Sequence, residues 1–290
     1  MGLWGRKEQP ADFGLAPHVR LVDARHGRFF VLDTDLYVSR SLQVYGEWTE
    51  AEIRLLSPML RPGDCVADIG ANLCSHTVPF ARTVGDDGRV IAFEPQPRIF
   101  QLLASNVTIN GLANVQLYQA ACAAAPGMLK LPHIDYATPG NFGGAKIRSL
   151  EAQGQAAGSS VHYVPVVRLD DVFDGDRLKL VKVDVEGMEK DVLTGAVRTL
   201  GRFRPLLYVE NENPQDSRGL LQALQDLDYV AYWHVITLFD PENFRRYPSD
   251  VFSGPGAPTG CVNNLCVPRE AGIDVRGLPQ VQAVTEHPRL

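Results

Sequence analysis

Long apolar runs are absent from this sequence of 290 residues. No stretch reaches the roughly 18 consecutive apolar residues that a membrane-spanning helix needs, so we expect no membrane span. The first residues, MGLWGRKEQPAD, include no apolar stretch of signal-peptide length, and Arg6 stands where a myristoylation signal requires Ser or Thr. These absences predict a cytoplasmic protein.

Positive charge and cysteine are also scarce. The chain has 28 Lys+Arg against 34 Asp+Glu, a formal net charge of −6, which argues against a nucleic-acid-binding protein because such proteins carry a basic face. The 5 cysteines have scattered spacings, unlike a secreted disulfide framework. Cys261 and Cys266 lack a second Cys/His pair at ligand spacing, so reduced thiols are favoured there over a zinc site.

The glycines of a dinucleotide-binding turn are missing as well. The segment DIGAN (68–72) follows a buried apolar strand, where Gly-x-Gly-x-x-Gly would be required, but Asn72, Cys74 and Ser75 follow Gly70. A pyrophosphate cradle is therefore poorly supported, and a nucleotide-dependent oxidoreductase is kept only as an alternative function. The acid before the turn suits a cationic or amine-bearing ligand, although the motif alone also fits an ordinary strand-to-helix turn.

What is present is an alternation of strand-length apolar segments and segments of helical period. Because the strands are nearly continuous apolar runs, both faces of the sheet must be covered by helices, which predicts an α/β fold. Residues 1–54 read as an N-terminal extension with a hairpin and cap, 55–270 as the main domain and 271–290 as a peripheral tail, with 125–163 an insertion or lid. The expected strands are 65–70, 89–94, 114–120, 178–184, 204–210 and 261–268, and the expected helices are 76–84, 97–110 and 188–200.

Acidic residues end several of these strands. Asp68, Glu94, Asp184 and Glu210 converge on one rim if the strands are parallel, because such sheets bind ligands outside the carboxyl ends of their strands. Glu94 lies where a carboxylate accepts hydrogen bonds from both ribose hydroxyls of a nucleoside. In KVDVEGME (182–189), Asp184 and Glu186 suit a general base or a divalent metal ion, provided that the strand has already turned between them. Glu189 alone fits a solvated acid in the first turn of a helix.

These motifs resemble the FkbM family of S-adenosylmethionine-dependent methyltransferases. The resemblance rests on DIGAN with Thr77, FEP (93–95), KVDVEGME and the preceding RLDDVF (168–173), and it extends to YGEWTEAE (45–52), LFDPENFR (238–245) and VNNLCVP (262–268). It implies a class I, Rossmann-like methyltransferase fold with a mostly parallel seven-stranded sheet, helices on both faces, and S-adenosylmethionine as the cofactor.

The resemblance also implies roles for individual residues. The methionine part of the cofactor would be lined by Asp68, Gly70, Ala71 and Asn72, the ribose held by Glu94, and the adenine bordered by Ala120 and Ala121. His76, Thr77 and Pro95 complete the expected cofactor site. Cys74 departs from the glycine usual in the family, so its side chain is expected to narrow the approach to the cofactor and put affinity in doubt.

The expected function is O-methylation of a hydroxyl on a sugar, glycan or natural product, and a non-catalytic cofactor-binding protein is the second alternative. We expect Asp184 and Glu186 to face the methyl group and to bind the acceptor or take its proton, with Glu210 and His234 behind them. The sequence leaves open the acceptor, a metal ion at Asp184 and Glu186, and a homo-oligomer. Weaker candidates, each equally consistent with packing or a plain loop, are His133, His162, Tyr45, Glu47, Trp48, Asn141, Gly143 and Gly144.

Overall fold

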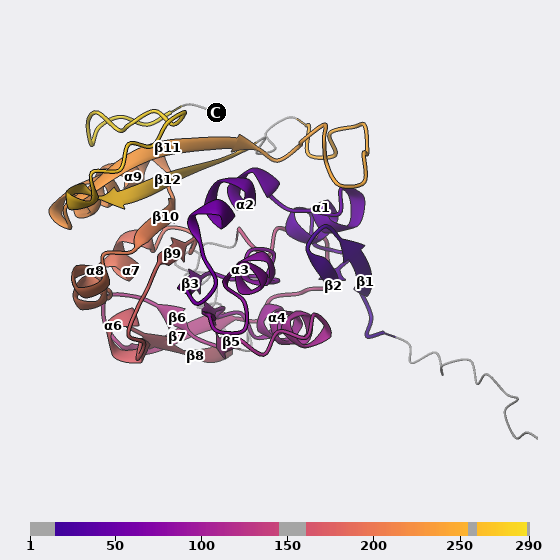
Figure 1. Ribbon diagram of the computed structural model, residues 1–290. Helices are drawn as coiled ribbons and strands as arrows, with labels where there is room; N and C mark the ends of the chain where they lie inside the picture. The colour runs from indigo at the N-terminus through magenta and orange to yellow at the C-terminus, as the bar shows by residue number, and fades with distance from the viewer. Residues whose placement is uncertain (1–14, 145–160, 255–259, 289–290) are drawn as a thin grey trace, which may run out of the picture.

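A seven-stranded sheet forms the centre of the molecule in the computed structural model, which describes residues 15–144, 161–254 and 260–288 (Figure 1). The strand order is β11-β12-β10-β9-β3-β4-β5. Five strands are parallel, namely β3 (Cys65–Ile69), β4 (Arg89–Phe93), β5 (Val115–Tyr118), β9 (Leu180–Val183) and β10 (Leu206–Glu210). The last strand of the chain, β12 (Gly260–Pro268), is antiparallel to β10 and to β11 (Tyr229–Thr237).

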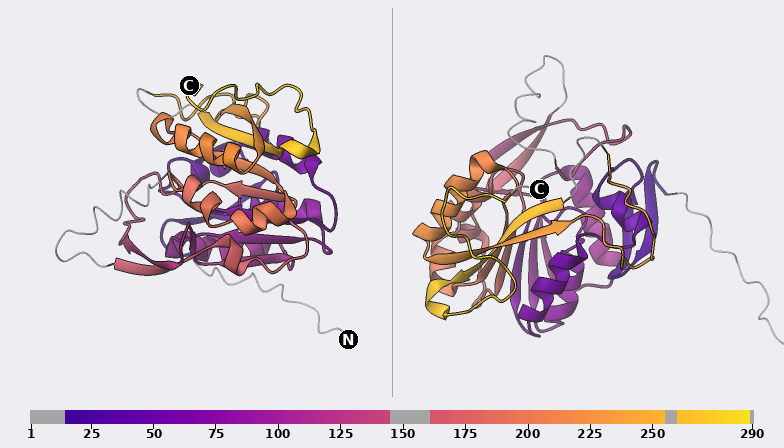
Figure 2. Two further views of the ribbon diagram at one scale, coloured as in Figure 1. Left: turned by 90° about the vertical axis from the view of Figure 1, so that its left-hand side faces the viewer. Right: turned by 90° about the horizontal axis from the view of Figure 1, so that it is seen from above.

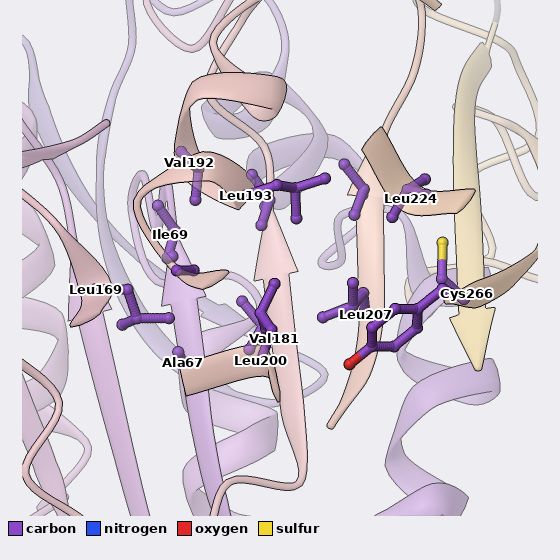
Figure 3. Close-up of a cluster of buried hydrophobic side chains, with 14 of the residues drawn as sticks. Ala67, Ile69, Leu169, Val181, Val192, Leu193, Leu200, Leu207, Leu224 and Cys266 are labelled. Atoms are coloured by element: carbon purple, nitrogen blue, oxygen red, sulfur yellow. The ribbon is translucent and has the colours of Figure 1, made fainter. Parts of the chain in front are cut away.

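Helices cover both faces of this sheet (Figure 2) because alternate residues of each strand point to opposite sides. Ala67 and Ile69 of β3 pack with α7 (Glu189–Thr194), α8 (Val197–Phe203) and α9 (Pro214–Asp226) in one apolar cluster, part of which Figure 3 shows. Val66 packs on the other face against α2 (Glu50–Leu56) and α3 (Thr77–Val84). The predicted α/β architecture with a mostly parallel seven-stranded sheet is confirmed.

The N-terminal hairpin packs on the edge of the same domain. β1 (Val19–Ala24) and β2 (Gly27–Leu32) pair in antiparallel register, and α1 (Val38–Val44) follows. The Asn106 amide, in α4 (Pro97–Ile109), exchanges hydrogen bonds with the backbone of Phe30. Short 3-10 helices cover Ser57–Met59 and Arg269–Ala271, and α6 (Leu169–Val172) precedes β9.

Three parts of the chain differ from the sequence-based expectation. The predicted helix over 188–200 is two helices that are separated at Gly195 and Ala196, and Gly195 lies so close to the backbone of Ala123 that a Cβ on it would be 2.1 Å from the Ala123 oxygen. The region 125–163 contains strands β7 (Gly127–Pro132) and β8 (Val161–Val167), which form a small sheet with β6 (Ala121–Cys122); its residues 145–160 lie outside the described part. Helix α9 and strand β11 are additions that the sequence pattern does not predict.

In the described residues, no helix combines the length and apolarity needed to cross a membrane.

Candidate functional site

The carboxyl ends of the parallel strands frame a pocket of about 770 Å³. Asp184 follows β9 directly and Glu210 is the last residue of β10, so both acids stand at this rim, as the sequence predicts. The pocket is lined by Tyr37, Val38, Trp48, Thr49, Glu52, Gly70, Ala71, Asn72, Ser75, His76, Asn141, Gly143, Gly144, Lys182, Asp184, Glu186, Glu210, Glu212, Leu238, Gly260, Cys261 and Asn263. A second pocket of about 470 Å³ shares Gly70, Gly143, Asp184 and Glu186 with the first.

The turn after β3 requires a glycine at position 70. Gly70 has φ +84°, and its N–H donates to the Phe93 carbonyl at 3.0 Å. A Cβ at this position would lie 1.7 Å from the backbone oxygen of Asp184. The absence of a side chain therefore lets the two strand ends meet and leaves the backbone of Gly70 and Ala71 accessible to a ligand on the pocket side.

Beneath this turn lies a buried cation, Lys182, that the sequence analysis does not single out. Its Nζ lies 3.1 Å from Asp184 Oδ2, 3.4 Å from the Gly70 carbonyl and 3.5 Å from Asp68 Oδ1. Burial by itself lowers the pKa of Lys182, but attraction by Asp184, Asp68 and Glu52 outweighs it and raises that pKa. Lys182 therefore stays charged and holds the ends of β3 and β9 together.

Asp68 is placed differently from its expected role. Its side chain is fully buried, accepts a 2.7 Å hydrogen bond from Thr77 Oγ1, and lines neither pocket. Within residues 15–144, 161–254 and 260–288, Oδ1 makes no hydrogen bond, and its ion pair is with Lys182 at 3.5 Å. Asp68 and Thr77 thus support the turn from below, whereas the sequence predicts that they line the cofactor directly.

Glu94 lies at the floor of the second pocket, directly after β4. Its Oε2 accepts from the Asn72 N–H at 3.1 Å and its Oε1 from the Gln96 N–H at 2.8 Å. Burial raises its pKa to about 7. The remaining lone pairs of the carboxylate can accept further hydrogen bonds from a ligand. Apolar and small residues face it across the pocket: Ile69, Phe93, Pro95, Ala120, Ala121, Val185 and Met188.

Three carboxylates meet where the two pockets join. One oxygen each of Asp184, Glu186 and Glu210 lies within 4.8 Å of the others, and Glu186 adopts φ +56°, so the chain has turned after β9 as the prediction required. Burial, followed by repulsion from Asp184 and Glu186, raises the pKa of Glu210 well above its usual value. Such a cluster can bind a cationic group, share a proton, or hold a divalent ion.

A hydrogen-bonded pair, Glu52 and His76, forms the opposite wall of the larger pocket. His76 Nε2 lies 2.6 Å from Glu52 Oε2, and both side chains are buried. Asn263 in β12 donates to Glu52 Oε1 at 3.0 Å. Sequence reasoning missed Glu52 and Asn263, although both stand in the segments YGEWTEAE and VNNLCVP that carry the resemblance.

Several other candidates lie elsewhere. His234 lines a neighbouring pocket with Tyr45 and Glu47, and its Nδ1 is 2.8 Å from the Tyr208 hydroxyl. His133 and His162 line a fourth, separate pocket. Trp48, Asn141, Gly143 and Gly144, by contrast, do line the main pocket.

The cysteine expectations are revised by the structure. Cys74 has φ +67°, and its buried side chain belongs to an apolar cluster with residues of β2, α1 and α4 rather than to either pocket, so it does not narrow the approach. Cys261 and Cys266 are an odd number of positions apart in β12 and face opposite sides of the sheet, which excludes a shared metal ion.

Comparison with known protein families identifies the class of protein to which this chain belongs. The methyltransferase FkbM domain matches residues 64–231, more than half of the chain, which therefore belongs to the FkbM methyltransferase family. S-adenosylmethionine is the cofactor of these methyltransferases, and the oxidoreductase alternative is set aside.

Individual relatives and solved structures share only modest sequence identity with this chain. Methyltransferase sdnD of Sordaria araneosa is 28% identical over 184 residues, covering 55% of this chain and 70% of that protein. Methyltransferase 1 of Beauveria bassiana is 30% identical over 145 residues, covering 45% of this chain and 57% of that protein. Among solved structures, a precorrin-6y C5,15-methyltransferase from Geobacter metallireducens aligns with a TM-score of 0.48 at 14% identity, covering 82% of this chain and 94% of that chain.

The residues present fit this cofactor. Glu94 offers a carboxylate to ribose hydroxyls, the small residues Ala120 and Ala121 leave room for a flat base, and the Gly70–Asn72 turn leaves backbone groups accessible at the junction of the pockets. The excess of carboxylates at that junction matches the positive charge of a sulfonium and an amine.

Proposed function

We propose that this chain is an S-adenosylmethionine-dependent O-methyltransferase that acts on a hydroxyl of a sugar, glycan or natural product. The observation that carries the proposal is the junction of the two pockets at Asp184 and Glu186. The smaller pocket has the lining of a nucleoside site, and the larger one leaves space beside the junction for an acceptor.

We assign the cofactor to the smaller pocket and to the turn between the pockets. Glu94 would hold the ribose, with Pro95, Ala120 and Ala121 around the base. Gly70, Ala71 and Asn72 line the continuation into the larger pocket, where the amino-acid end would lie, and His76 lines the part of that pocket assigned to the acceptor. Asp68 and Thr77 act through the turn that they support.

The acceptor would occupy the larger pocket. When bound, S-adenosylmethionine supplies a methyl group whose bond to sulfur breaks, with its electron pair, as the acceptor oxygen takes the carbon. The protein contributes mainly by holding the two reactants close and aligned. Asp184, Glu186 and Glu210 are placed to bind acceptor hydroxyls, and Asn141, Gly143 and Gly144 border the same space. The 125–163 region is thereby proposed as an insertion that shapes the acceptor site of a 55–270 methyltransferase domain.

The polarity of this pocket supports the proposed acceptor class. Among the described residues, its lining has the carboxylates Glu52, Asp184, Glu186 and Glu212 and a single lysine, Lys182, and this excess of negative charge disfavours phosphorylated or carboxylated acceptors by like-charge repulsion. Neutral polyols and amine-bearing molecules suit it. A divalent ion at the three carboxylates is compatible with the same lining.

The proposal is tested by binding and turnover. Calorimetric titration with S-adenosylmethionine and S-adenosylhomocysteine should show micromolar binding that Glu94→Ala weakens, and NADH should not bind. Release of S-adenosylhomocysteine is then followed over a panel of glycosides, amino sugars and hydroxylated natural products, with and without Mg²⁺. Asp184→Asn should abolish turnover while sparing cofactor binding. Absence of cofactor binding, or binding without turnover of any hydroxyl acceptor, would contradict the proposal.

A further inference from the structure

We propose that His76, oriented by Glu52, is the general base that takes the proton of the acceptor hydroxyl. This inference rests on the O-methyltransferase function proposed above and adds a catalytic residue and a positioning residue to it. It is carried by the placement of a buried histidine–carboxylate pair in the wall of the acceptor pocket.

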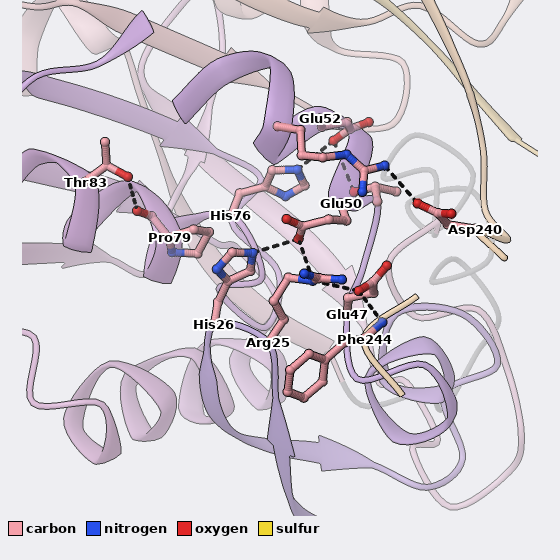
Figure 4. A network of polar contacts seen from close by, with 12 residues as sticks. Arg25, His26, Glu47, Glu50, Glu52, His76, Pro79, Thr83, Asp240 and Phe244 are labelled. Carbon is pink, nitrogen blue, oxygen red and sulfur yellow. Dashed lines mark hydrogen bonds and ion pairs between the residues drawn. The ribbon is translucent and has the colours of Figure 1, made fainter. Parts of the chain in front are cut away.

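The pair joins segments that are distant along the chain. Glu52 comes from α2, and His76 immediately precedes α3; their side chains point toward one another across the space between the two helices (Figure 4). The 2.6 Å contact is between Glu52 Oε2 and His76 Nε2, and His76 is 4% and Glu52 5% exposed. Both residues nevertheless line the main pocket, so a ligand there reaches them.

The carboxylate is itself held in place. Asn263 donates to Oε1 at 3.0 Å, and Thr49 Oγ1 donates to Oε2 at 3.2 Å. The pKa of Glu52 is lowered overall: burial raises it, whereas the hydrogen bond and charge of a protonated His76 and the charge of Lys182 lower it. With His76 neutral, the donors Asn263 and Thr49 and the nearby Lys182 still favour an ionised carboxylate. A fixed carboxylate oxygen 2.6 Å from Nε2 favours a proton on that nitrogen, which leaves the lone pair of the neutral ring on Nδ1. In the proposal, Nδ1 is the atom that takes the proton of the acceptor.

The other polar groups near the pocket are less suited to this task. Asp184 accepts a 3.1 Å hydrogen bond from Lys182, and a bound cation weakens a carboxylate as a base. Glu210 carries a raised pKa inside a carboxylate cluster and favours its protonated form. His234 of β11 contacts Tyr208 of β10 and lines the neighbouring pocket instead. Among the described residues, the titratable groups that interact with Glu52 besides His76 are Lys182 of β9, Tyr208 of β10, His234 of β11 and Cys261 of β12.

Atoms and charges balance in the proposed step. The acceptor oxygen forms its bond to the methyl carbon with a lone pair, the carbon–sulfur electron pair remains on sulfur as a neutral thioether, and the hydroxyl proton passes to His76 Nδ1. The imidazolium, stabilised by Glu52, then releases the proton to water. The net products are a methyl ether, S-adenosylhomocysteine and one proton, and no further reactant is consumed.

Histidine NMR tests the state of His76 without requiring a known acceptor. Long-range ¹H–¹⁵N spectra of the S-adenosylhomocysteine complex are recorded from pH 5 to 9, with the His76 signals identified by their loss in His76→Asn. We expect the neutral form of His76 to carry its proton at Nε2 and its lone pair at Nδ1. In Glu52→Gln this preference should weaken, because an amide oxygen is a weaker acceptor for the Nε2 proton than a carboxylate. An imidazolium that persists to pH 9, or a neutral form protonated at Nδ1, would overturn the inference.

Kinetics on a hydroxyl acceptor found in the panel test the catalytic role. His76→Asn should lower kcat by about 10²- to 10⁴-fold, the usual contribution of a general base, with cofactor Kd within about threefold of wild type. Added imidazole should partly rescue His76→Gly. Glu52→Gln should lower kcat less than His76→Asn, and Glu52→Asp should restore part of the loss because it keeps a carboxylate on this side of His76.

The chain offers a matched control in a second histidine–glutamate pair. His26 Nε2 lies 2.7 Å from Glu50 Oε2, outside the main pocket, and Figure 4 shows the two pairs side by side. His26→Asn and Glu50→Gln should leave kcat and its pH profile unchanged. If the wild type turns over and His76→Asn keeps a near-wild-type kcat, the proposed role of His76 is refuted and the O-methyltransferase function is not. If the wild type binds the cofactor but shows no turnover, the O-methyltransferase proposal is refuted. The NMR spectra report the protonation state of His76 in either case.

Discussion

Gly70 and Asp184 meet backbone to backbone: a Cβ on Gly70 would lie 1.7 Å from the Asp184 carbonyl oxygen. This contact joins the turn after β3 to the end of β9, and both residues line the two pockets. The geometry of the turn after β3 and the position of the Asp184 carboxylate are therefore set by one close approach.

The first prediction concerns this contact. Gly70→Ala should destabilise the fold by more than about 3 kcal/mol and abolish S-adenosylmethionine binding, because a backbone atom rather than a flexible side chain must move and φ is +84°. Urea unfolding and calorimetry measure the two effects. Gly201→Ala is the control: Gly201 lies in α8, where an added Cβ would meet no atom within 4 Å, so helix propensity should stabilise this variant by about 0.5–1 kcal/mol. Equal stabilities of the two variants would contradict the prediction.

A second prediction follows from the pKa of Glu94, which burial raises to about 7. In the proposed site, ribose hydroxyls would donate to the ionised carboxylate, so binding would favour the deprotonated form and affinity should fall as the pH drops through 7. Linkage predicts about tenfold weaker S-adenosylhomocysteine binding at pH 6 than at pH 8. Glu94→Gln should bind more weakly and lose this dependence, and any slope that it retains reports titration of the ligand. An identical slope in both proteins would remove Glu94 from the effect.

The third prediction is that Lys182→Met strongly destabilises the protein. Asp68 is fully buried and would lose the cationic partner that it has among the described residues, and removal of one member of a buried ion pair costs about 3–5 kcal/mol. Arg54→Met is the matched surface control. Its guanidinium lies 2.8 Å from Asp240 with about half of the side chain exposed, so about 0–1 kcal/mol is expected. Chemical denaturation of the three proteins compares them, and a loss in Lys182→Met no larger than in Arg54→Met would show that Asp68 does not depend on the lysine.

A fourth prediction concerns Cys74, whose φ is +67°. Cys74→Gly should be about 1 kcal/mol more stable than Cys74→Ala, the reverse of the usual order, since both lose the thiol but only glycine avoids the left-handed strain. Because the side chain packs into an apolar cluster outside the pockets, both variants should keep the cofactor Kd within about twofold of wild type. A marked gain in affinity for Cys74→Gly would place the thiol in the cofactor path after all.

Local sequence patterns are sufficient to predict the order along the chain of the central strands and helices. They also predict that the acids at the strand ends lie at the rim of the sheet. These follow from local rules: continuous apolar runs bounded by turns make buried strands, and an acid that ends a parallel strand has one edge of the sheet to occupy. The turn at Gly70 and the carboxylates Glu94, Asp184, Glu186 and Glu210 are of this kind.

Which side chains share a pocket, and which face away from it, depends on the tertiary structure and cannot be predicted from local patterns. Glu52 meets His76 and Asn263 because α2, the start of α3 and β12 pack at the same end of the sheet, a contact between residues 24 and 211 positions apart that no local pattern encodes. Likewise, Asp68 is buried and pairs with Lys182, whereas the sequence predicts a contact with the ligand. The left-handed backbone at Cys74 directs its side chain into the apolar core. Side-chain direction depends on backbone dihedrals and on neighbours far along the chain, and both are fixed only when the layers pack.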